Sequence, residues 1–203
     1  MSVLSDFDLS NMIRSKRLVI DPFTKDIIRE NGIDFRLDNE VAHHKNLGKD
    51  FIMDPSDANM IASAYDLEKN LDKIVIGSRE QVLLSTMEYM ELPDDIMSMV
   101  ELRSTWARHG LCMPPTIVDA GFKGNITLEV FNNAPYSIAL KPGVRFAHMI
   151  FIKTSNKVTN LYAGKYSGQR GVKLPKVILN DEVIPKKGSK RKDYDAQKQL
   201  RFR

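Results

Sequence analysis

Apolar and polar residues alternate along much of the second half of the chain, and this alternation predicts strands. The strand-like segments are residues 73–77, 81–92, 96–103, 124–133, 136–143 and 144–153. Turn-forming residues separate them, namely Gly77, Pro93, Asp94, Gly121, Asn132, Asn133, Pro142 and Gly143. Because short strands at regular spacing are typical of sandwiches and barrels, the pattern predicts a mainly β fold.

The first part of the chain predicts one short N-terminal helix and one strand. In LSDFDLSNMIRSKRLV the apolar residues recur at helical spacing, and Ser5 or Asp6 can cap the helix. The segment GIDFRLDNEV alternates apolar residues with polar ones, Asp34 among them, so one side of this strand faces water or a site. Residues 42–72 are polar and irregular, with a modest helical tendency at residues 59–71.

Composition indicates an ordinary globular protein. The 203 residues are 42% hydrophobic and 28% charged, which suits one domain with a core. Apolar runs fall short of the ~18 to 20 residues that cross a bilayer, and the N-terminus lacks the order of a signal peptide. The single cysteine, Cys112, excludes a disulfide framework and a multi-cysteine zinc site. We therefore expect a cytoplasmic protein without a membrane segment.

The positive charge is concentrated in the last residues. Residues 186–203 hold eight Lys or Arg against two Asp, a charge of +6, and subtraction from the net +4 leaves about −2 for residues 1–185. No aromatic platform is interleaved with this charge, so nucleic-acid binding is not favoured. We predict one domain at residues 1–176 and a flexible basic tail at residues 177–203.

Several chemically capable side chains gather in RSTWARHGLCMPPTIVDAGFKGNITLEV. Ser104 and Arg108 are one helical turn apart, and the start of that turn beside Arg103 suits a phosphate. Period-two alternation places Glu129 on the strand face opposite the apolar residues, and Asp119 precedes a glycine bend. Each residue alone is typical of a solvated surface position, but together they indicate a nucleotide-hydrolysing site.

This region and others resemble dCTP deaminases, in particular archaeal ones, within the superfamily that includes trimeric dUTPases. The resemblance is carried by LSDFDL, NGIDFRLDNEV, MEYMELPDDI, LRSTWARHGL, TIVDAGFKGNITLEV, KPGVRFAHMIF and YAGKYSGQRG. It ends near Lys176 and leaves the tail unexplained. It implies a distorted β-barrel with jelly-roll character, of the dUTPase-like β-clip type, in a homotrimer with sites between subunits. The implied reaction is hydrolytic deamination of dCTP to dUTP and ammonia.

The resemblance also implies residue roles. Glu129 would be the general acid/base, with Ser104 and Arg108 completing the catalytic group. Tyr162, Lys165 and Gln169 match a lid, and His148 stands where relatives often have glutamine. The implied substrate-binding positions are Arg103, Ser104, Thr105, Trp106, Ala107, Arg108, Asp119, Phe122, Thr127, Leu128, Glu129, His148, Tyr162, Lys165 and Gln169. Residues 112–118 form a shorter loop than in some relatives, which leaves the base contacts there open.

The sequence favours metal-independent chemistry. None of the four histidines has the glutamate two positions on that zinc deaminases require, so we expect no zinc and no metal-ligating residues, and Mg²⁺ only with the triphosphate. dTTP is a candidate inhibitor. Three alternatives stay open: a bifunctional dCTP deaminase/dUTPase that yields dUMP and pyrophosphate, a dUTPase, and a non-catalytic nucleotide-binding regulator. Glu129 and Arg108 favour deamination over dUTP hydrolysis alone.

Overall fold

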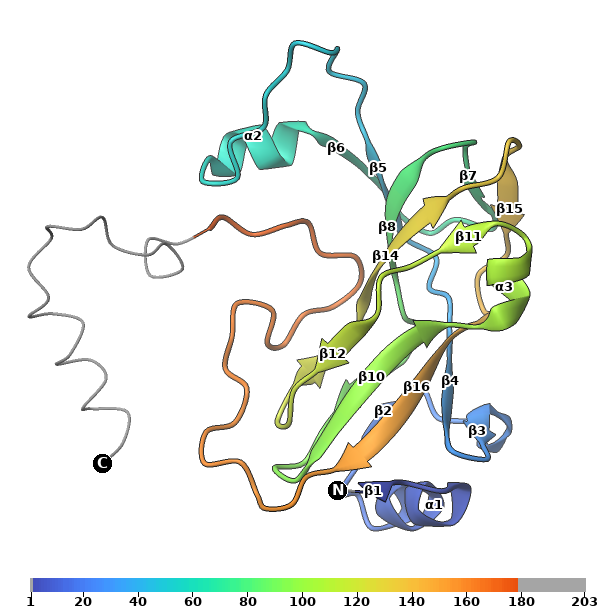
Figure 1. Ribbon diagram of the computed structural model, residues 1–203, viewed down its shortest axis with the longest axis vertical. Coiled ribbons are helices and arrows are strands. Elements are labelled where there is room, and N and C mark those ends of the chain that lie inside the picture. Colours follow the sequence, from blue (N-terminus) through green and yellow to red (C-terminus); the bar gives the residue numbers. More distant parts are fainter. Residues whose placement is uncertain (1, 179–203) are drawn as a thin grey trace, which may run out of the picture.

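The computed structural model describes residues 2–178, and two large antiparallel sheets make up most of this part of the chain (Figure 1). The first sheet has the spatial order β12 (Thr116–Val118), β10 (Ile96–Leu102), β16 (Arg145–Lys153), β4 (Gly32–Arg36) and β3 (Ile28–Arg29), with β1 (Ser2–Val3) beside β16. The second sheet has the order β11 (Leu111–Cys112), β14 (Thr127–Asn132), β8 (Gln81–Ser85), β5 (Val41–His44) and β6 (Tyr65–Glu68).

Smaller sheets complete the described part of the chain. One joins β13 (Lys123–Gly124), β9 (Tyr89–Glu91) and β2 (Val19–Asp21), and another joins β15 (Ile138–Leu140) and β7 (Ile74–Ile76). The mainly β fold expected from the sequence is confirmed. Among residues 2–178 the sheets stay separate and do not close into one barrel.

The predicted N-terminal helix is confirmed as α1 (Asp6–Arg14). Ser5 caps it in a reciprocal capping box with Asp8, and Leu9 and Met12 are buried. The other helical segments are η1 (Lys25–Ile27), a 3₁₀ turn, α2 (Ala58–Ser63) and α3 (Ser104–Arg108).

One apolar core cluster includes residues of both large sheets. Ile33 and Phe35 of β4 belong to it together with Leu84 of β8 and Val130 of β14, and all four are fully buried. Alternate residues of β14 face this core, so Glu129 faces away from it, as the period-two pattern predicts.

Residues 81–92, predicted as one strand, form two strands in different sheets. The break falls at two buried polar side chains. Thr86 donates its hydroxyl to the Glu88 carbonyl at 2.9 Å and accepts the Ile126 N–H at 2.9 Å. The Glu88 carboxylate accepts the Nε–H of Arg36 at 2.5 Å. These bonds satisfy polar groups inside an otherwise strand-like pattern, and they turn the chain from one sheet to the other.

Residues 42–72 are more regular than expected, and the helix predicted at residues 59–71 is wrong beyond Ser63. Asp57 caps α2 by accepting the Asn59 and Met60 N–H groups. The flanking strands β5 and β6 pair with each other, and β5 also pairs with β8. Polar residues form strands here because partners distant in the sequence supply the backbone hydrogen bonds.

The chain after β16 runs along one side of the molecule and passes over the second sheet (Figure 1). Within this segment Val172 packs against Ala42 and Leu83. Its N–H donates to Glu40 Oε2 at 3.0 Å, and the Lys173 N–H donates to Thr127 Oγ1 at 3.2 Å. The segment therefore covers the sheet face that carries Glu129. Most of the predicted basic tail, residues 179–203, lies outside the described residues.

Candidate active site

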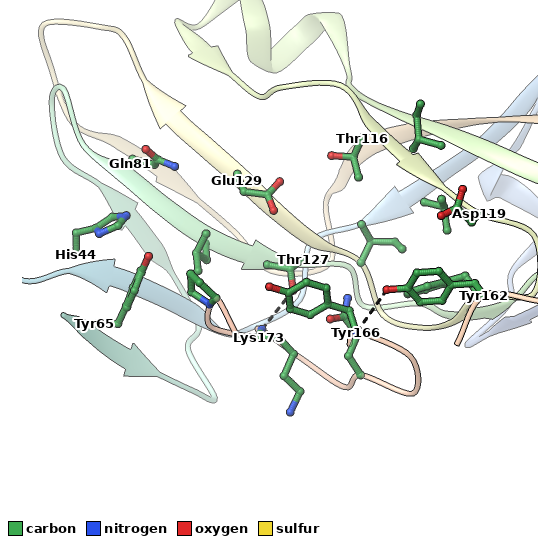
Figure 2. A pocket seen from close by; sticks show the side chains of 17 residues that line it. His44, Tyr65, Gln81, Thr116, Asp119, Thr127, Glu129, Tyr162, Tyr166 and Lys173 are labelled. Atoms are coloured by element: carbon green, nitrogen blue, oxygen red, sulfur yellow. Dashed lines mark hydrogen bonds between the residues drawn. The ribbon is translucent and has the colours of Figure 1, made fainter. Parts of the chain in front are cut away.

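A cavity of about 430 Å³ opens on this covered sheet face; we call it the Glu129 cavity. Figure 2 shows the Glu129 carboxylate pointing into it from β14, between Gln81 on one side and Thr116 on the other. Asp119 and Tyr162 lie toward one end. The cavity therefore combines one central carboxylate with aromatic and hydroxyl-bearing walls.

Glu129 is half-buried, and this burial raises the pKa of its carboxyl group. A hydrogen bond from its own backbone N–H lowers the pKa by less. A carboxylate with a raised pKa is a stronger base than an exposed one, and a pKa closer to neutrality lets one group both accept and return a proton. The position suits general acid/base chemistry.

An aromatic pair stands beside Asp119 at one end of the cavity. The rings of Phe122 and Tyr162 are 5.7 Å apart between centroids and inclined at 49°. Gly121 has φ +85°, and a Cβ added there would lie 2.8 Å from the Leu161 side chain, so glycine permits this close approach. Apolar rings next to an exposed carboxylate suit a sugar, which presents both CH and hydroxyl groups.

Gln169 contributes a buried acceptor to the wall. Its side chain is 9% exposed, and its Nε2 donates to the Asn125 carbonyl at 2.6 Å. Its Oε1 is buried without a hydrogen-bond partner among the described residues. Since buried polar atoms are normally paired, an unpaired amide oxygen in the cavity wall is unusual.

A second cavity of about 330 Å³ lies at the start of α3; we call it the Arg103 cavity. Its lining includes Arg103, Ser104 and His148 together with the buried carboxylate of Asp34. Arg103 Nε lies 3.3 Å from Asp34 Oδ2, and His148 Nδ1 lies 2.9 Å from Asp34 Oδ1. Arg103 Nη1 also donates to the Arg145 carbonyl at 3.3 Å. A guanidinium held in this way suits an anionic ligand.

Within one chain the predicted site residues fall into separate groups. The Glu129 cavity is lined by Asp119, Phe122, Thr127, Glu129, Tyr162 and Gln169. The Arg103 cavity is lined by Arg103, Ser104 and His148. Neither cavity is lined by Thr105, Trp106, Ala107, Arg108, Leu128 or Lys165.

Two members of this last group have side chains that face the protein interior. Leu128 is 1% exposed and packs in the core, so only its backbone is placed for the predicted contact with a base. Trp106 packs on Phe146 and donates its Nε1–H to the Arg145 carbonyl at 2.9 Å. By contrast, Arg108 is exposed at the end of α3. The roles predicted for these residues stay predictions.

Sequence reasoning missed His44, Tyr65, Gln81, Tyr166 and Lys173, which also line the Glu129 cavity. Strand geometry places Gln81 on the face of Glu129, because Leu83 pairs with Glu129 and residues two apart share a face. Finding it required knowledge that β8 pairs with β14.

The described residues include no group of three or more His, Cys, Asp or Glu side chains arranged to hold a metal ion. Within residues 2–178 we also find no helix long and apolar enough to cross a membrane.

The fold is that of dCTP deaminases. The crystal structure of 2′-deoxycytidine 5′-triphosphate deaminase from Agrobacterium tumefaciens matches with a TM-score of 0.58 at 17% identity, over 73% of this chain and 46% of that one. The present chain thus matches less than half of that longer protein, and the likeness concerns the fold.

Sequence comparison is more specific: the chain belongs to the dCTP deaminase-like family, whose profile matches residues 3–154. The chain is 47% identical over 174 residues to the protein named dCTP deaminase of Saccharolobus solfataricus, covering 86% of this chain and 91% of that one. It is 46% identical over 174 residues to the dCTP deaminase of Acidianus ambivalens, with coverages of 86% and 97%.

Proposed function

We propose that this protein is an enzyme that hydrolyses dCTP to dUTP and ammonia, with Glu129 as the general acid/base. The observation that carries the proposal is the half-buried Glu129 carboxylate, with its raised pKa, in a cavity of nucleoside size. Membership of the dCTP deaminase-like family and the names of the archaeal relatives support dCTP as the substrate.

In the proposed reaction Glu129 takes a proton from a water molecule, whose oxygen attacks C4 of cytosine. The same carboxyl group then delivers the proton to N3. A second proton passes through Glu129 from the added hydroxyl to the exocyclic amine, which leaves as ammonia. Because one group accepts and returns each proton, a pKa raised toward neutrality serves every step.

The other residues of the Glu129 cavity would hold the nucleoside. We assign Asp119 to the 3′-hydroxyl of the deoxyribose and the Phe122–Tyr162 pair to the apolar face of the sugar. Thr127 lies on the same strand face as Glu129, where it would meet the cytosine. The buried Oε1 of Gln169 would accept a hydrogen bond from the nucleotide.

We propose that a second copy of the chain completes each site. Ser104 and Arg108 lie on α3 and do not line the Glu129 cavity of their own chain. A head-to-tail contact that closes into a ring would bring α3 of one copy to the cavity of the next. The homotrimer expected from the sequence is such a ring.

The triphosphate would then occupy the Arg103 cavity as its Mg²⁺ complex. Arg103 and Ser104 supply donors there, and His148 lines the same cavity. Glu30 and Glu101 line the same cavity. Mg²⁺ would neutralise part of the phosphate charge.

We further propose that the chemistry needs no zinc, since the water is activated by Glu129. Full activity in the presence of a zinc-selective chelator and excess Mg²⁺ is the expected result, and inactivation reversed by added zinc would contradict it. Inhibition by dTTP and a cytoplasmic location stay predictions, to be tested by dTTP titration and by cell fractionation.

Chromatography of the products formed from dCTP tests the central proposal. We expect dUTP with one equivalent of ammonia. Accumulation of dUMP with pyrophosphate would instead indicate the bifunctional enzyme, and turnover of dUTP but not dCTP would indicate a dUTPase. Binding of dCTP without turnover would refute the catalytic assignment and favour a regulator.

A further inference from the structure

Asp34 is a buried carboxylate that the proposed reaction does not use. Its side chain is 2% exposed, and its Oδ1 pairs with His148 Nδ1 at 2.9 Å. Its Oδ2 has no hydrogen-bond partner among the described residues, although Arg103 Nε lies 3.3 Å and Arg145 Nη1 lies 3.8 Å away. Burial of a carboxylate is costly, and one incompletely hydrogen-bonded oxygen adds to that cost.

Sheet register brings these groups together. β4 pairs with β16 so that Asp34 lies directly opposite His148, and β10 lies on the other side of β16 and leads into Arg103. Gly32 leaves room for the histidine ring, because a Cβ added there would lie 2.6 Å from His148 Nε2. The arrangement is therefore built by the first sheet and not by the mobile ends of surface side chains.

Other buried ion pairs of the fold differ from this one. Asp95 binds Arg17 Nη2 through both oxygens, at 2.6 and 2.8 Å, and neither residue lines the Glu129 or the Arg103 cavity. Asp34 instead contacts Arg103 and His148, which both line the Arg103 cavity, and it lines that cavity itself.

We propose that Asp34 is a positioning residue that orients Arg103 and His148 toward the triphosphate of the nucleotide; this rests on the proposed function. The Asp34 carboxylate attracts the Arg103 guanidinium through the ion pair at Nε, while the Arg145 carbonyl accepts a hydrogen bond from Nη1, and the two contacts together restrict the guanidinium. The contact of Asp34 with Nδ1 of His148 holds the imidazole ring in one place in the cavity wall.

The charge balance supports this role. Arg29, Glu30 and Glu101 also line the Arg103 cavity, so it is not simply a basic patch that would bind any anion. Without the Asp34 carboxylate, Arg103 and His148 would lose the partner that they share, and each would sample several rotamers. Each binding event would then lose the conformational entropy of ordering these two side chains.

Isothermal titration of Glu129→Gln protein, which should bind dCTP without turning it over, with Mg²⁺-dCTP and with dCMP tests the proposal, and each variant below is made in this background. Asp34→Asn should weaken dCTP binding by about tenfold or more, the effect of losing a charge-assisted contact, and change dCMP binding by less than about twofold. Arg103→Lys keeps the positive charge but loses the Nε contact, so it should weaken dCTP binding to a similar extent. Combining both substitutions should add little, because they break the same contact.

Asp95→Asn is the matched control, since it removes a buried carboxylate from an ion pair outside the cavity. It should lower the melting temperature and leave the dCTP affinity unchanged. Equal weakening of dCTP and dCMP by Asp34→Asn, wild-type dCTP affinity in Arg103→Lys, or independent effects in the double variant would overturn the proposal. Should Asp34→Asn not fold, Arg103→Lys alone decides.

The measurement also separates this inference from the proposed function. If the variants change dCTP binding as expected but the wild-type protein releases no dUTP, deamination is refuted and the role of Asp34 is supported. Wild-type protein that does not bind dCTP would overturn both.

Discussion

Two inactive variants should restore activity when they assemble together. Glu129→Gln removes the acid/base from the Glu129 cavity, and Arg108→Ala removes a guanidinium from the exposed end of α3. Each alone should lower deamination by about 10²- to 10⁴-fold. If a site joins the cavity of one copy to α3 of the next, some sites in a mixed oligomer receive both intact residues.

The size of the recovery follows from counting. In a random equal mixture the cavity keeps Glu129 in half of the sites and α3 keeps Arg108 in half of them, so about one quarter of the sites are intact. Mixed trimers isolated from the uniform ones hold one intact site in three, and therefore about one third of wild-type activity. Mixed dimers would recover about one half, so the value also reports the number of subunits.

The assay uses co-expression with two different affinity tags, sequential purification, and chromatographic measurement of dUTP formation. Glu129→Gln mixed with Asp119→Ala is the matched control, because both residues line one cavity of one chain and no mixed site is intact. No recovery with the Arg108 pair, in verified mixed oligomers, would refute a site shared between copies.

The remaining predictions concern Glu129, the segment that contains Val172, and α3. Because burial raises the pKa of Glu129, the folded state holds that proton more tightly, and stability is lost as pH rises through the raised pKa. Glu129→Gln should therefore have a melting temperature at or above that of the wild type by calorimetry. A lower melting temperature would contradict the reasoning. For the same reason kcat/KM should fall on acidification at a higher pH than the ~4.3 of an unperturbed glutamate, and a pH–rate profile without such a limb contradicts the base assignment. Glu40→Ala frees the Val172 N–H, so trypsin should cleave after Lys173 faster than in the wild type, and equal rates would show that Glu40 does not hold the segment. Trp106→Phe loses the hydrogen bond to the Arg145 carbonyl and should lower the free energy of unfolding by about 1 kcal/mol in urea, whereas an unchanged midpoint would show that the bond contributes nothing.

Local patterns predicted the parts of this fold that depend on neighbours in the sequence. The capped helix at the N-terminus and the outward face of Glu129 both follow from periodicity, and both are observed. The strands at residues 41–44 and 65–68 were not predicted, because their polar residues pair with each other and with β8. The break at Thr86 was also not predicted, because one of the hydrogen bonds of its hydroxyl is made with the N–H of Ile126, just before β14, and the other with the Glu88 carbonyl.

The sequence by itself determined the chemical inventory: a glutamate on a strand, two arginines around one helical turn, an aspartate before a glycine bend, and the family to which they belong. Only the tertiary structure decided which of these groups share a cavity. Glu129 and Arg108 are near in the sequence but belong to different surfaces of one chain, whereas Asp34 and His148 are 114 positions apart and form a pair. The physical reason is that periodicity reports which face a side chain occupies, while sheet register decides which distant face it meets.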